Sequence, residues 1–547
     1  MIIKYIGIEN FGVFSGKSEF NFETSKTNLI IGENGSGKST ILFLLNFLLD
    51  PKIRKNGLKE EWINTGNRKS TVPSIIEFKF CVRDIAILST LAIVENDEIY
   101  IKMEILFEAG EYNVYFYIGE TEKLKFDYFR PLPFDKYINV LFIKDSIFED
   151  EGVNLIKTHI NENESKESII NLIDSYIEES NINISEISEI KNINNFAKNA
   201  ITNIFDDDEN FSIKITSNIK FSNKFNKLKF QPINKLDEGQ LVTHGSGFEK
   251  IFSLLSLIKT LEYNETKIIL LWDEPENNLF FTYQKKIIEF IKQKEETIIC
   301  SVFATHSPNI VELLPGTSIS KIYDNKIKTF HIGPNEHYYS YQADLSKHIF
   351  YDYVVLLEGH SEKMFFEYIS NQNQYIKNLI KGKSISFLNI QGTHFKEIYN
   401  LLSVLCKKVI VLTDNDIFSN KMQGYYRLIQ LIPNNVDILK ITKDGSLDFL
   451  IVDENNVDAI TIDQKNMCTT ILKTLNKNGL YIPENFKDSF EEELKKDNLI
   501  DDNELKSLKN SKLKKLSEKI DTINQKINLV TIQNSNYLFK WLKDLNE

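Results

Sequence analysis

Residues 32–40 read Gly-Glu-Asn-Gly-Ser-Gly-Lys-Ser-Thr, and they stand between an apolar strand-like run, Asn-Leu-Ile-Ile-Gly, and an apolar segment of helical character. Glycines in such a loop let backbone N–H groups close around phosphates, and the following helix N-terminus favours negative charge. The spacing predicts that Lys38 reaches the β- and γ-phosphates of ATP and that the Ser39 hydroxyl ligates Mg²⁺. The expected nucleotide-binding residues of this loop are Gly32, Asn34, Gly35, Gly37, Lys38, Ser39 and Thr40.

A second apolar run ends in two carboxylates. Residues 268–275 read Ile-Ile-Leu-Leu-Trp-Asp-Glu-Pro. At the end of a strand, Asp273 can hold the shell of Mg²⁺ and Glu274 can polarise the attacking water. Acidic residues commonly end strands, so this interpretation depends on the phosphate-binding loop in the same chain.

Two further segments resemble ABC-type ATPases. Thr305-His306-Ser307-Pro308 follows an apolar strand-like run, which places His306 where a switch histidine senses the γ-phosphate. Residues 244–249, His-Gly-Ser-Gly-Phe-Glu, resemble a degenerate ABC signature, in which Ser246 and Gly247 contact nucleotide. In that family the signature of one head meets the nucleotide of another, so the resemblance implies ATP-dependent dimerisation. The segment departs from Leu-Ser-Gly-Gly-Gln, and a simple loop-to-helix cap is the alternative.

A second group of carboxylates lies further along the chain. Residues 357–362 read Leu-Glu-Gly-His-Ser-Glu, and residues 412–416 read Leu-Thr-Asp-Asn-Asp, each after an apolar strand-like run. In a βαβ arrangement both segments lie at the carboxyl edge of a parallel sheet. Converging carboxylates repel one another unless cations lie between them, which predicts bound Mg²⁺ or Mn²⁺. The candidate metal ligands are Glu358, Glu362, Asp414 and Asp416.

The order of these motifs resembles the OLD (overcoming lysogenisation defect) nucleases, in which an ABC ATPase head precedes a TOPRIM domain. The likeness is greatest to the ATPase–nuclease subunits of Gabija-type anti-phage systems and to retron-associated OLD nucleases. It implies an ATP-regulated, metal-dependent endonuclease that cuts duplex DNA and acts in anti-phage defence. It also implies a further acidic metal ligand, for which Asp448 is the candidate, and a lysine near the scissile phosphate, for which Lys512 is the candidate.

The resemblance extends to assembly and partners. It implies a homodimer or homotetramer. It also implies a companion protein, which would be a helicase, as in Gabija-like systems, or a retron reverse transcriptase with its RNA–DNA product. The sequence itself does not choose between these companions.

Changes in composition predict the domain organisation. We expect an α/β protein with an ABC-type P-loop ATPase domain over residues 1–335, a TOPRIM α/β domain over 340–455 and a mainly helical part over 456–547 that completes the nuclease domain. Within the first domain, strand-rich runs between 75 and 118 suggest an antiparallel meander. Residues from about 150 to 205 have helical spacing and are expected to form a dimerisation insert.

Composition limits the other possibilities. The chain of 547 residues carries a formal net charge of −12, so nucleic acid would be held by local Lys and Arg patches or through metal ions. Its four cysteines form no C-x-x-C pair, which argues against a zinc module and suits a reducing cytoplasm. The longest apolar run, residues 41–49, is far short of the ~20 residues that a membrane span needs.

Three alternative functions share some of these motifs. A topoisomerase needs a tyrosine-bearing cleavage domain, and TOPRIM primases generally carry a zinc module, so neither fits well. A RecF-like ATP switch that binds DNA without cutting it would carry a degenerate second domain, whereas Glu358, Asp414 and Asp416 are all present. A nuclease that acts on RNA stays open, because the metal chemistry does not require deoxyribose.

Overall fold

A computed structural model gives the fold of the chain. The structure describes residues 2–22, 26–69, 72–81, 97–108, 110–119, 138–144, 211–217, 228–234, 267–277, 279–314, 317–323, 326–331, 345–390, 395–414, 462–483, 489–510 and 512–545, with the single positions 132, 135, 254, 258, 428, 431 and 432. The chain divides into two compact units, residues 1–334 and 335–547. Each unit is described by itself.

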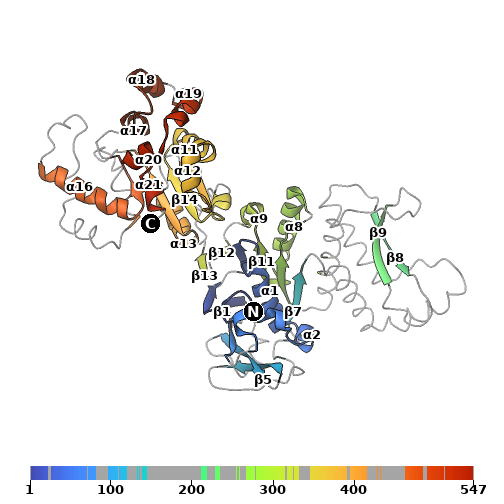
Figure 1. Ribbon diagram of the computed structural model, residues 1–547. Coiled ribbons are helices and arrows are strands. Elements are labelled where there is room, and N and C mark those ends of the chain that lie inside the picture. Colours follow the sequence, from blue (N-terminus) through green and yellow to red (C-terminus); the bar gives the residue numbers. More distant parts are fainter. Residues whose placement is uncertain are drawn as a thin grey trace, which may run out of the picture. The chain divides into compact units, whose positions relative to one another are not determined.

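A six-stranded sheet forms the centre of the first unit (Figure 1). Its order is β13 (Lys326–His331), β12 (Ser318–Tyr323), β3 (Thr27–Gly32), β11 (Ile298–Thr305), β10 (Lys267–Asp273) and β7 (Ile138–Ile143). Only β13 is antiparallel to its neighbour. Because β3, β10 and β11 are parallel neighbours, the segments that follow them all emerge at one edge of the sheet.

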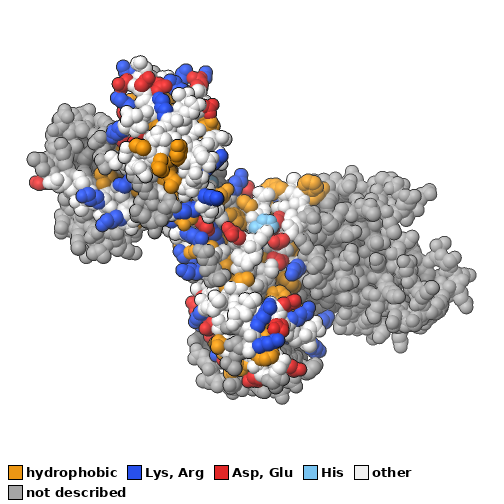
Figure 2. Space-filling view, in the orientation of Figure 1, with side chains coloured by type: hydrophobic (Ala, Val, Ile, Leu, Met, Phe, Trp, Pro, Cys, Tyr) orange, Lys and Arg blue, Asp and Glu red, His pale blue; other side chains and the backbone are white. Residues whose placement is uncertain are grey.

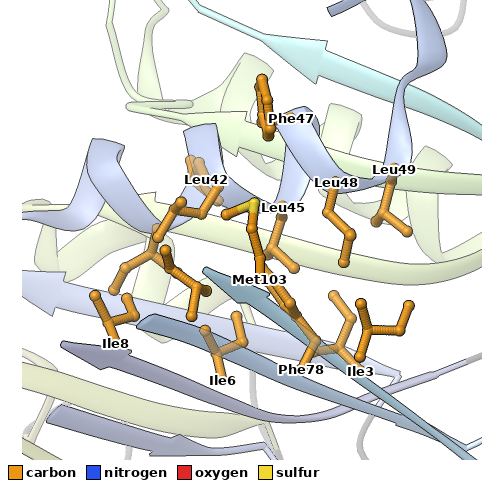
Figure 3. Close-up of a cluster of buried hydrophobic side chains, with 14 of the residues drawn as sticks. Ile3, Ile6, Ile8, Leu42, Leu45, Phe47, Leu48, Leu49, Phe78 and Met103 are labelled. Carbon is orange, nitrogen blue, oxygen red and sulfur yellow. The ribbon is translucent and has the colours of Figure 1, made fainter. Parts of the chain in front are cut away.

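Helix α1 (Lys38–Leu49) is apolar on nearly every side, as expected of a helix that is buried all round. Its leucines pack against the six-stranded sheet and against a second, antiparallel sheet of five strands (Figure 3). The order of the second sheet is β2 (Ser18–Asn21), β1 (Ile2–Glu9), β4 (Ser74–Cys81), β5 (Glu98–Glu108) and β6 (Glu111–Ile118). Strands β4, β5 and β6 form the antiparallel meander that the sequence predicts.

The described part of the first unit contains further helices, turns and strands. Helix α8 (Phe281–Gln293) follows β10, and α9 (Pro308–Leu313) follows β11. Helix α2 (Pro51–Lys55) and two 3₁₀ turns, η1 (Glu60–Trp62) and η2 (Thr65–Asn67), continue the chain after α1. Strands β8 (Phe211–Ser217) and β9 (Leu228–Asn234) form a separate antiparallel hairpin.

The second unit contains a four-stranded parallel sheet. Its order is β15 (Ile385–Asn389), β14 (Tyr353–Leu357), β16 (Lys408–Leu412) and β17 (Leu480–Tyr481). The first crossovers contain α11 (His360–Gln372), α12 (Gln374–Leu379) and α13 (Phe395–Leu405). The later helices are α16 (Ile462–Lys477), α17 (Phe490–Lys496), α18 (Asp502–Asn510), α19 (Lys512–Lys526), α20 (Leu529–Asn534) and α21 (Lys540–Asp544).

One hydrophobic core joins the sheet of the second unit to its C-terminal helices. Phe365 and Phe366 of α11 make ring contacts with Phe490, Phe539 and Trp541 from the end of the chain. The C-terminal part therefore packs directly on the elements that carry the acidic motifs. The predicted α/β fold class, with a mainly helical C-terminal region, is confirmed.

Several predicted features lie outside the described residues. These are the helical insert at 150–205, the signature-like segment with Ser246 and Gly247, and the candidate ligands Asp416 and Asp448. Within the ranges that are described, no helix is long and apolar enough to cross a membrane. On the face seen in Figure 2, Lys and Arg side chains of the described residues lie among Asp and Glu side chains.

Candidate functional site

The loop between β3 and α1 has the backbone that a phosphate cradle requires. Gly37 is the N-cap of α1 and has a φ of 109°, and Gly35 has a φ of 78°, both in a region that favours glycine. A Cβ atom on Gly37 would lie 2.7 Å from Val13 Cγ2 and 2.9 Å from Phe14 Cζ. Glycine is therefore required at position 37 by conformation and by space.

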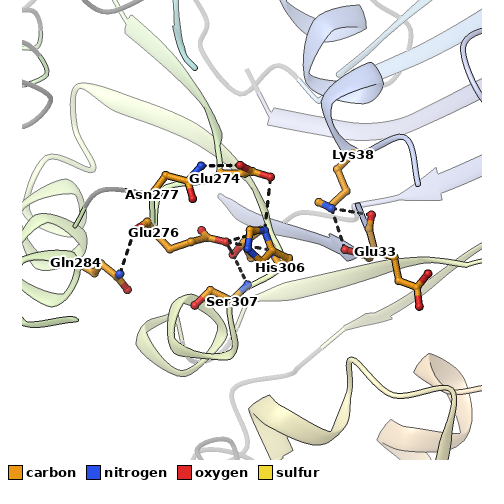
Figure 4. Close-up of polar contacts among 10 residues, drawn as sticks. Glu33, Lys38, Glu274, Glu276, Asn277, Gln284, His306 and Ser307 are labelled. Carbon is orange, nitrogen blue, oxygen red and sulfur yellow. Dashed lines mark hydrogen bonds and ion pairs between the residues drawn. The ribbon is translucent and has the colours of Figure 1, made fainter. Parts of the chain in front are cut away.

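Lys38 is buried at the first turn of α1. Its Nζ donates to the carbonyl oxygens of Gly32, at 2.8 Å, and Glu33, at 2.9 Å (Figure 4). Burial lowers the pKa of Lys38, and the carboxylates of Glu274 and Asp273 oppose that shift. The ammonium group is thus held at the loop by neutral carbonyls that a phosphate could replace.

Asp273 and Ser39 form the pair that the sequence predicts for a metal. The Asp273 carboxylate at the end of β10 accepts a hydrogen bond from the Ser39 side chain. Burial raises the pKa of Asp273, and the neighbouring Glu274 adds to that shift. Asp273 Oδ1 is buried and finds no hydrogen-bond partner in the described part of the chain. A buried, unpaired carboxylate oxygen beside a hydroxyl is a donor set that fits Mg²⁺.

Glu274 has an unusual backbone conformation. Its φ is 52°, which is uncommon for a residue other than glycine and often occurs at functional sites. The turn is fixed because Glu274 N–H donates to the Ala304 carbonyl at 2.8 Å, across the β10–β11 pair. Asn277 Nδ2 donates to Glu274 Oε2 at 2.6 Å and so holds the carboxylate in place. The half-buried Glu274 side chain is therefore positioned from two sides.

His306 lies beside Glu274 and a second carboxylate, Glu276 (Figure 4). His306 Nδ1 is 3.5 Å from Glu274 Oε1 and 3.4 Å from Glu276 Oε1. The structure thus brings together Lys38, Ser39, Asp273, Glu274 and His306 at the ends of three neighbouring strands. The D-E-P-E run contains Glu276, a residue to which the sequence pattern alone assigns no role.

In the second unit, the ends of β14 and β16 carry the predicted acidic residues. Leu357 pairs with Leu412, so Glu358 and Thr413 follow at the same edge of the sheet. Glu358 Oε2 accepts hydrogen bonds from Thr413 Oγ1, at 2.6 Å, and from Asp414 N–H, at 3.1 Å. Asp414 Oδ1 accepts from the Phe490 N–H at 2.9 Å. Two predicted ligands, Glu358 and Asp414, are therefore adjacent.

Glu362 completes the E-G-x-x-E motif by lying over Gly359. A Cβ atom on Gly359 would lie 2.5 Å from Glu362 Oε2, so a larger residue would displace this carboxylate. Burial raises the pKa of Glu362. Burial, followed by the charges of Glu358 and Glu362, raises the pKa of Asp414 to about 8. Glu362 and Asp414 therefore resist carrying negative charges at the same time unless a cation is present.

Lys512 lies at the start of α19 and faces the same carboxylates. Its Nζ is 3.2 Å from Oε1 of Glu491, a buried residue of α17. Burial lowers the pKa of Lys512, but Glu491, Asp414 and Glu362 together raise it above its usual value. Lys512 is thus near the acidic residues despite a separation of about a hundred positions from Asp414. Glu491 stands in the charged run Phe-Glu-Glu-Glu-Leu-Lys-Lys, whose pattern is typical of a solvated helix, so the sequence gives no sign of its burial.

Tyr537 is a second residue that the sequence did not reveal. It is fully buried, and its hydroxyl donates to the Thr413 carbonyl at 3.2 Å. Burial, followed by the charges of Asp414, Glu362 and Glu358, raises the pKa of Tyr537. This tyrosine therefore links the C-terminal segment to the strand end that carries Asp414.

The acidic cluster fits a divalent cation in chemistry, but its described part is not a complete cage. Carboxylate oxygens are the ligands that Mg²⁺ and Mn²⁺ prefer. Among the residues whose positions are described, no group of three or more His, Cys, Asp or Glu side chains is arranged to hold a metal ion. Asp416 and Asp448 lie outside that part of the chain, so their assignment stays a prediction.

Comparison with known proteins finds a family match in each of the two units. Residues 27–312 match the family described as "AAA domain, putative AbiEii toxin, Type IV TA system", and residues 349–416 match "Overcoming lysogenization defect protein-like, TOPRIM domain". Endonuclease GajA from Bacillus cereus strain VD045 is 26% identical over 458 residues, which cover 78% of this chain and 77% of that protein.

Among solved structures, an Smc head bound to the C-winged helix domain of ScpA has a TM-score of 0.42 and 13% identity, covering 62% of this chain and 99% of that one. The recombination mediator protein RecF has a TM-score of 0.36 and 15% identity, covering 60% of this chain and 98% of that one.

The two family matches follow one another in the order that the motifs predict, and the first spans more than half of the chain. The predicted resemblance to the OLD nucleases is confirmed. The protein belongs to the AAA-domain family that residues 27–312 match, and this ATPase domain is followed by an OLD-like TOPRIM domain.

Proposed function

We propose that the protein is an ATP-regulated, metal-dependent endonuclease that hydrolyses phosphodiester bonds in duplex DNA. The observation that carries this proposal is the convergence of Glu358, Glu362, Asp414 and Glu491 with Lys512 at one edge of the OLD-like TOPRIM sheet. The similarity to an endonuclease over most of both chains supports the same function.

The residues of the nuclease site have distinct roles in this proposal. Glu358, Asp414 and the further predicted ligands Glu362, Asp416 and Asp448 would hold Mg²⁺ or Mn²⁺, which supplies an activated water and stabilises the leaving oxygen. Lys512 would place a positive charge near the scissile phosphate. Its ion pair with Glu491 keeps the ammonium group close to the acidic residues before the substrate binds.

The residues of the ATPase site also have distinct proposed roles. Lys38 would neutralise the phosphates, while Ser39 and Asp273 would hold Mg²⁺. Glu274 would orient the attacking water, and His306 would contact the γ-phosphate. Ser246 and Gly247 would contact the nucleotide of a second head.

A substrate comparison tests the nuclease proposal. The protein is incubated with supercoiled plasmid, linear duplex DNA or transfer RNA, in Mg²⁺ or Mn²⁺. We expect the supercoiled plasmid to be nicked or linearised and the RNA to stay intact. Cleavage of RNA alone would replace DNA by RNA as the target, and binding of DNA without cleavage of any substrate would favour a RecF-like switch.

Assembly is a separate proposal. Because an ABC site is completed by a second head, we expect at least a homodimer, and a homotetramer is also compatible. Light scattering with and without a non-hydrolysable ATP analogue measures the mass of the particle. A mass of one chain, about 64 kDa, under both conditions would contradict the proposal.

The cellular role is proposed from the same resemblance. We propose a cytoplasmic effector of anti-phage defence whose companion is a helicase or a retron reverse transcriptase with its RNA–DNA product. The identity of the neighbouring genes distinguishes these companions.

A further inference from the structure

Glu276 carries a largely buried carboxylate and stands in the segment that follows β10 in the ATPase domain. Its Oε1 accepts hydrogen bonds from Thr305 Oγ1, at 2.7 Å, and from the His306 N–H, at 3.1 Å. The same oxygen is 3.4 Å from His306 Nδ1. Glu276 Oε2 is buried and has no hydrogen-bond partner among the described residues. One oxygen thus contacts the segment that carries the switch histidine, and the other has no described partner.

A carboxylate in this position lowers the stability of the fold, so a structural role alone does not explain it. A buried carboxylate with one unsatisfied oxygen disfavours folding, and a neutral residue that still accepted from Thr305 would avoid part of that cost. Among the described residues, His306 Nδ1 lies within ion-pair distance of this carboxylate, at 3.4 Å, and could use its negative charge.

The imidazole ring has carboxylates from two residues at the same nitrogen. Glu274 Oε1 lies 3.5 Å from Nδ1, and Asn277 fixes Glu274 through its other oxygen. Two acceptors facing Nδ1 favour a proton on that atom, because carboxylates accept hydrogen bonds and do not donate them when ionised. Nε2 is then the ring nitrogen left for the nucleotide.

The loop that carries Glu276 is itself fixed. Gln284 of α8 is buried, and its Nε2 donates to the Leu279 carbonyl at 2.8 Å and to the Glu276 carbonyl at 3.4 Å. Thr305 also accepts from the Ser307 N–H at 2.9 Å, which fixes the backbone on the other side of His306. Glu276 therefore joins two segments that are each held rigidly.

We propose that Glu276 is a positioning residue of the ATPase site, which sets the orientation and the protonated nitrogen of His306 and acts on hydrolysis through that ring. This inference rests on the proposed role of His306. It assigns no contact between Glu276 and the nucleotide.

Glu276→Gln tests the inference, because glutamine can still accept from Thr305 and from the His306 N–H but lacks the negative charge that faces Nδ1. Steady-state ATP turnover and the melting temperature are measured for the full chain. We expect kcat to fall roughly tenfold or more, because the carboxylate charge that lies 3.4 Å from Nδ1 is lost, while KM for ATP stays within about twofold. Glu289→Gln makes the same change on the exposed side of α8 and should leave kcat and KM unchanged.

A double-mutant cycle shows whether Glu276 acts through His306. In the His306→Ala background, Glu276→Gln should change kcat by less than about twofold, since the ring that it positions is gone. The same tenfold fall in both backgrounds, or a wild-type kcat in Glu276→Gln, would overturn the inference. A wild-type kcat in His306→Ala would instead overturn the proposed role of His306, and the inference with it.

Discussion

Replacing Asp414 by alanine is expected to abolish cleavage of duplex DNA and to leave most of the ATP turnover intact. Asp414 lies beside Glu358, and burial, followed by the charges of Glu358 and Glu362, raises its pKa to about 8. Removing a metal ligand from such a cluster should empty or distort the metal site, which costs about a hundredfold or more in cleavage rate. Plasmid cleavage measures the nuclease activity and phosphate release measures the ATP turnover, both on one preparation of the variant.

Two further variants show whether the loss of cleavage comes from the lost charge or from a damaged fold. Asp414→Asn keeps an oxygen that can accept from the Phe490 N–H and removes the charge, so it should fold as well as the wild type and still fail to cut. Asp521→Asn makes the same change at an exposed position on α19 and should retain both activities. Full cleavage by Asp414→Asn would show that the charge at this position is not needed to hold the metal.

Replacing Glu274 by glutamine is expected to stop ATP hydrolysis while preserving ATP binding. The carboxylate is fixed by Asn277 and by the strained turn at the end of β10, where it can polarise water. Because a positioned general base contributes on the order of a hundredfold or more, phosphate release should fall by about that factor. Calorimetric titration with ATP should give a dissociation constant close to the wild-type value.

Lys38→Ala should differ from Glu274→Gln, because it is expected to reduce ATP binding as well as hydrolysis. Its ammonium group lies at the phosphate cradle, so its loss should weaken ATP binding itself.

The control for Glu274→Gln is Glu295→Gln. Glu295 is exposed and pairs with Lys26 at 3.3 Å, and its replacement should leave phosphate release at the wild-type rate. Unchanged phosphate release in Glu274→Gln would remove the assignment of this carboxylate.

Sequence alone predicts the residues that lie at strand ends. The phosphate-binding loop is contiguous, and parallel strands bring their carboxyl ends to one edge, so Asp273 and His306 can be placed together without coordinates. The same rule places Glu358 beside Asp414, which the register of β14 and β16 confirms.

Residues that reach a site from distant helices are harder to find. Glu491 stands in a run of acidic and basic residues typical of an exposed helix, yet it is buried against the acidic cluster. Tyr537 lies more than a hundred positions after Thr413, whose carbonyl it contacts. No local periodicity encodes such contacts, because they arise when the C-terminal helices pack on the sheet. The short strand β17 escaped prediction for a similar reason, since two residues give too little pattern.

A time course of supercoiled plasmid cleavage, run with the wild type and with Glu358→Ala in Mn²⁺ and in EDTA, tests the central claim most directly. Glu358 accepts from both Thr413 and Asp414, so it lies at the centre of the proposed metal site. The wild type should convert the plasmid in Mn²⁺ and leave it intact in EDTA, and Glu358→Ala should leave it intact in both. Equal conversion by Glu358→Ala and the wild type in Mn²⁺ would contradict a nuclease site in the TOPRIM domain.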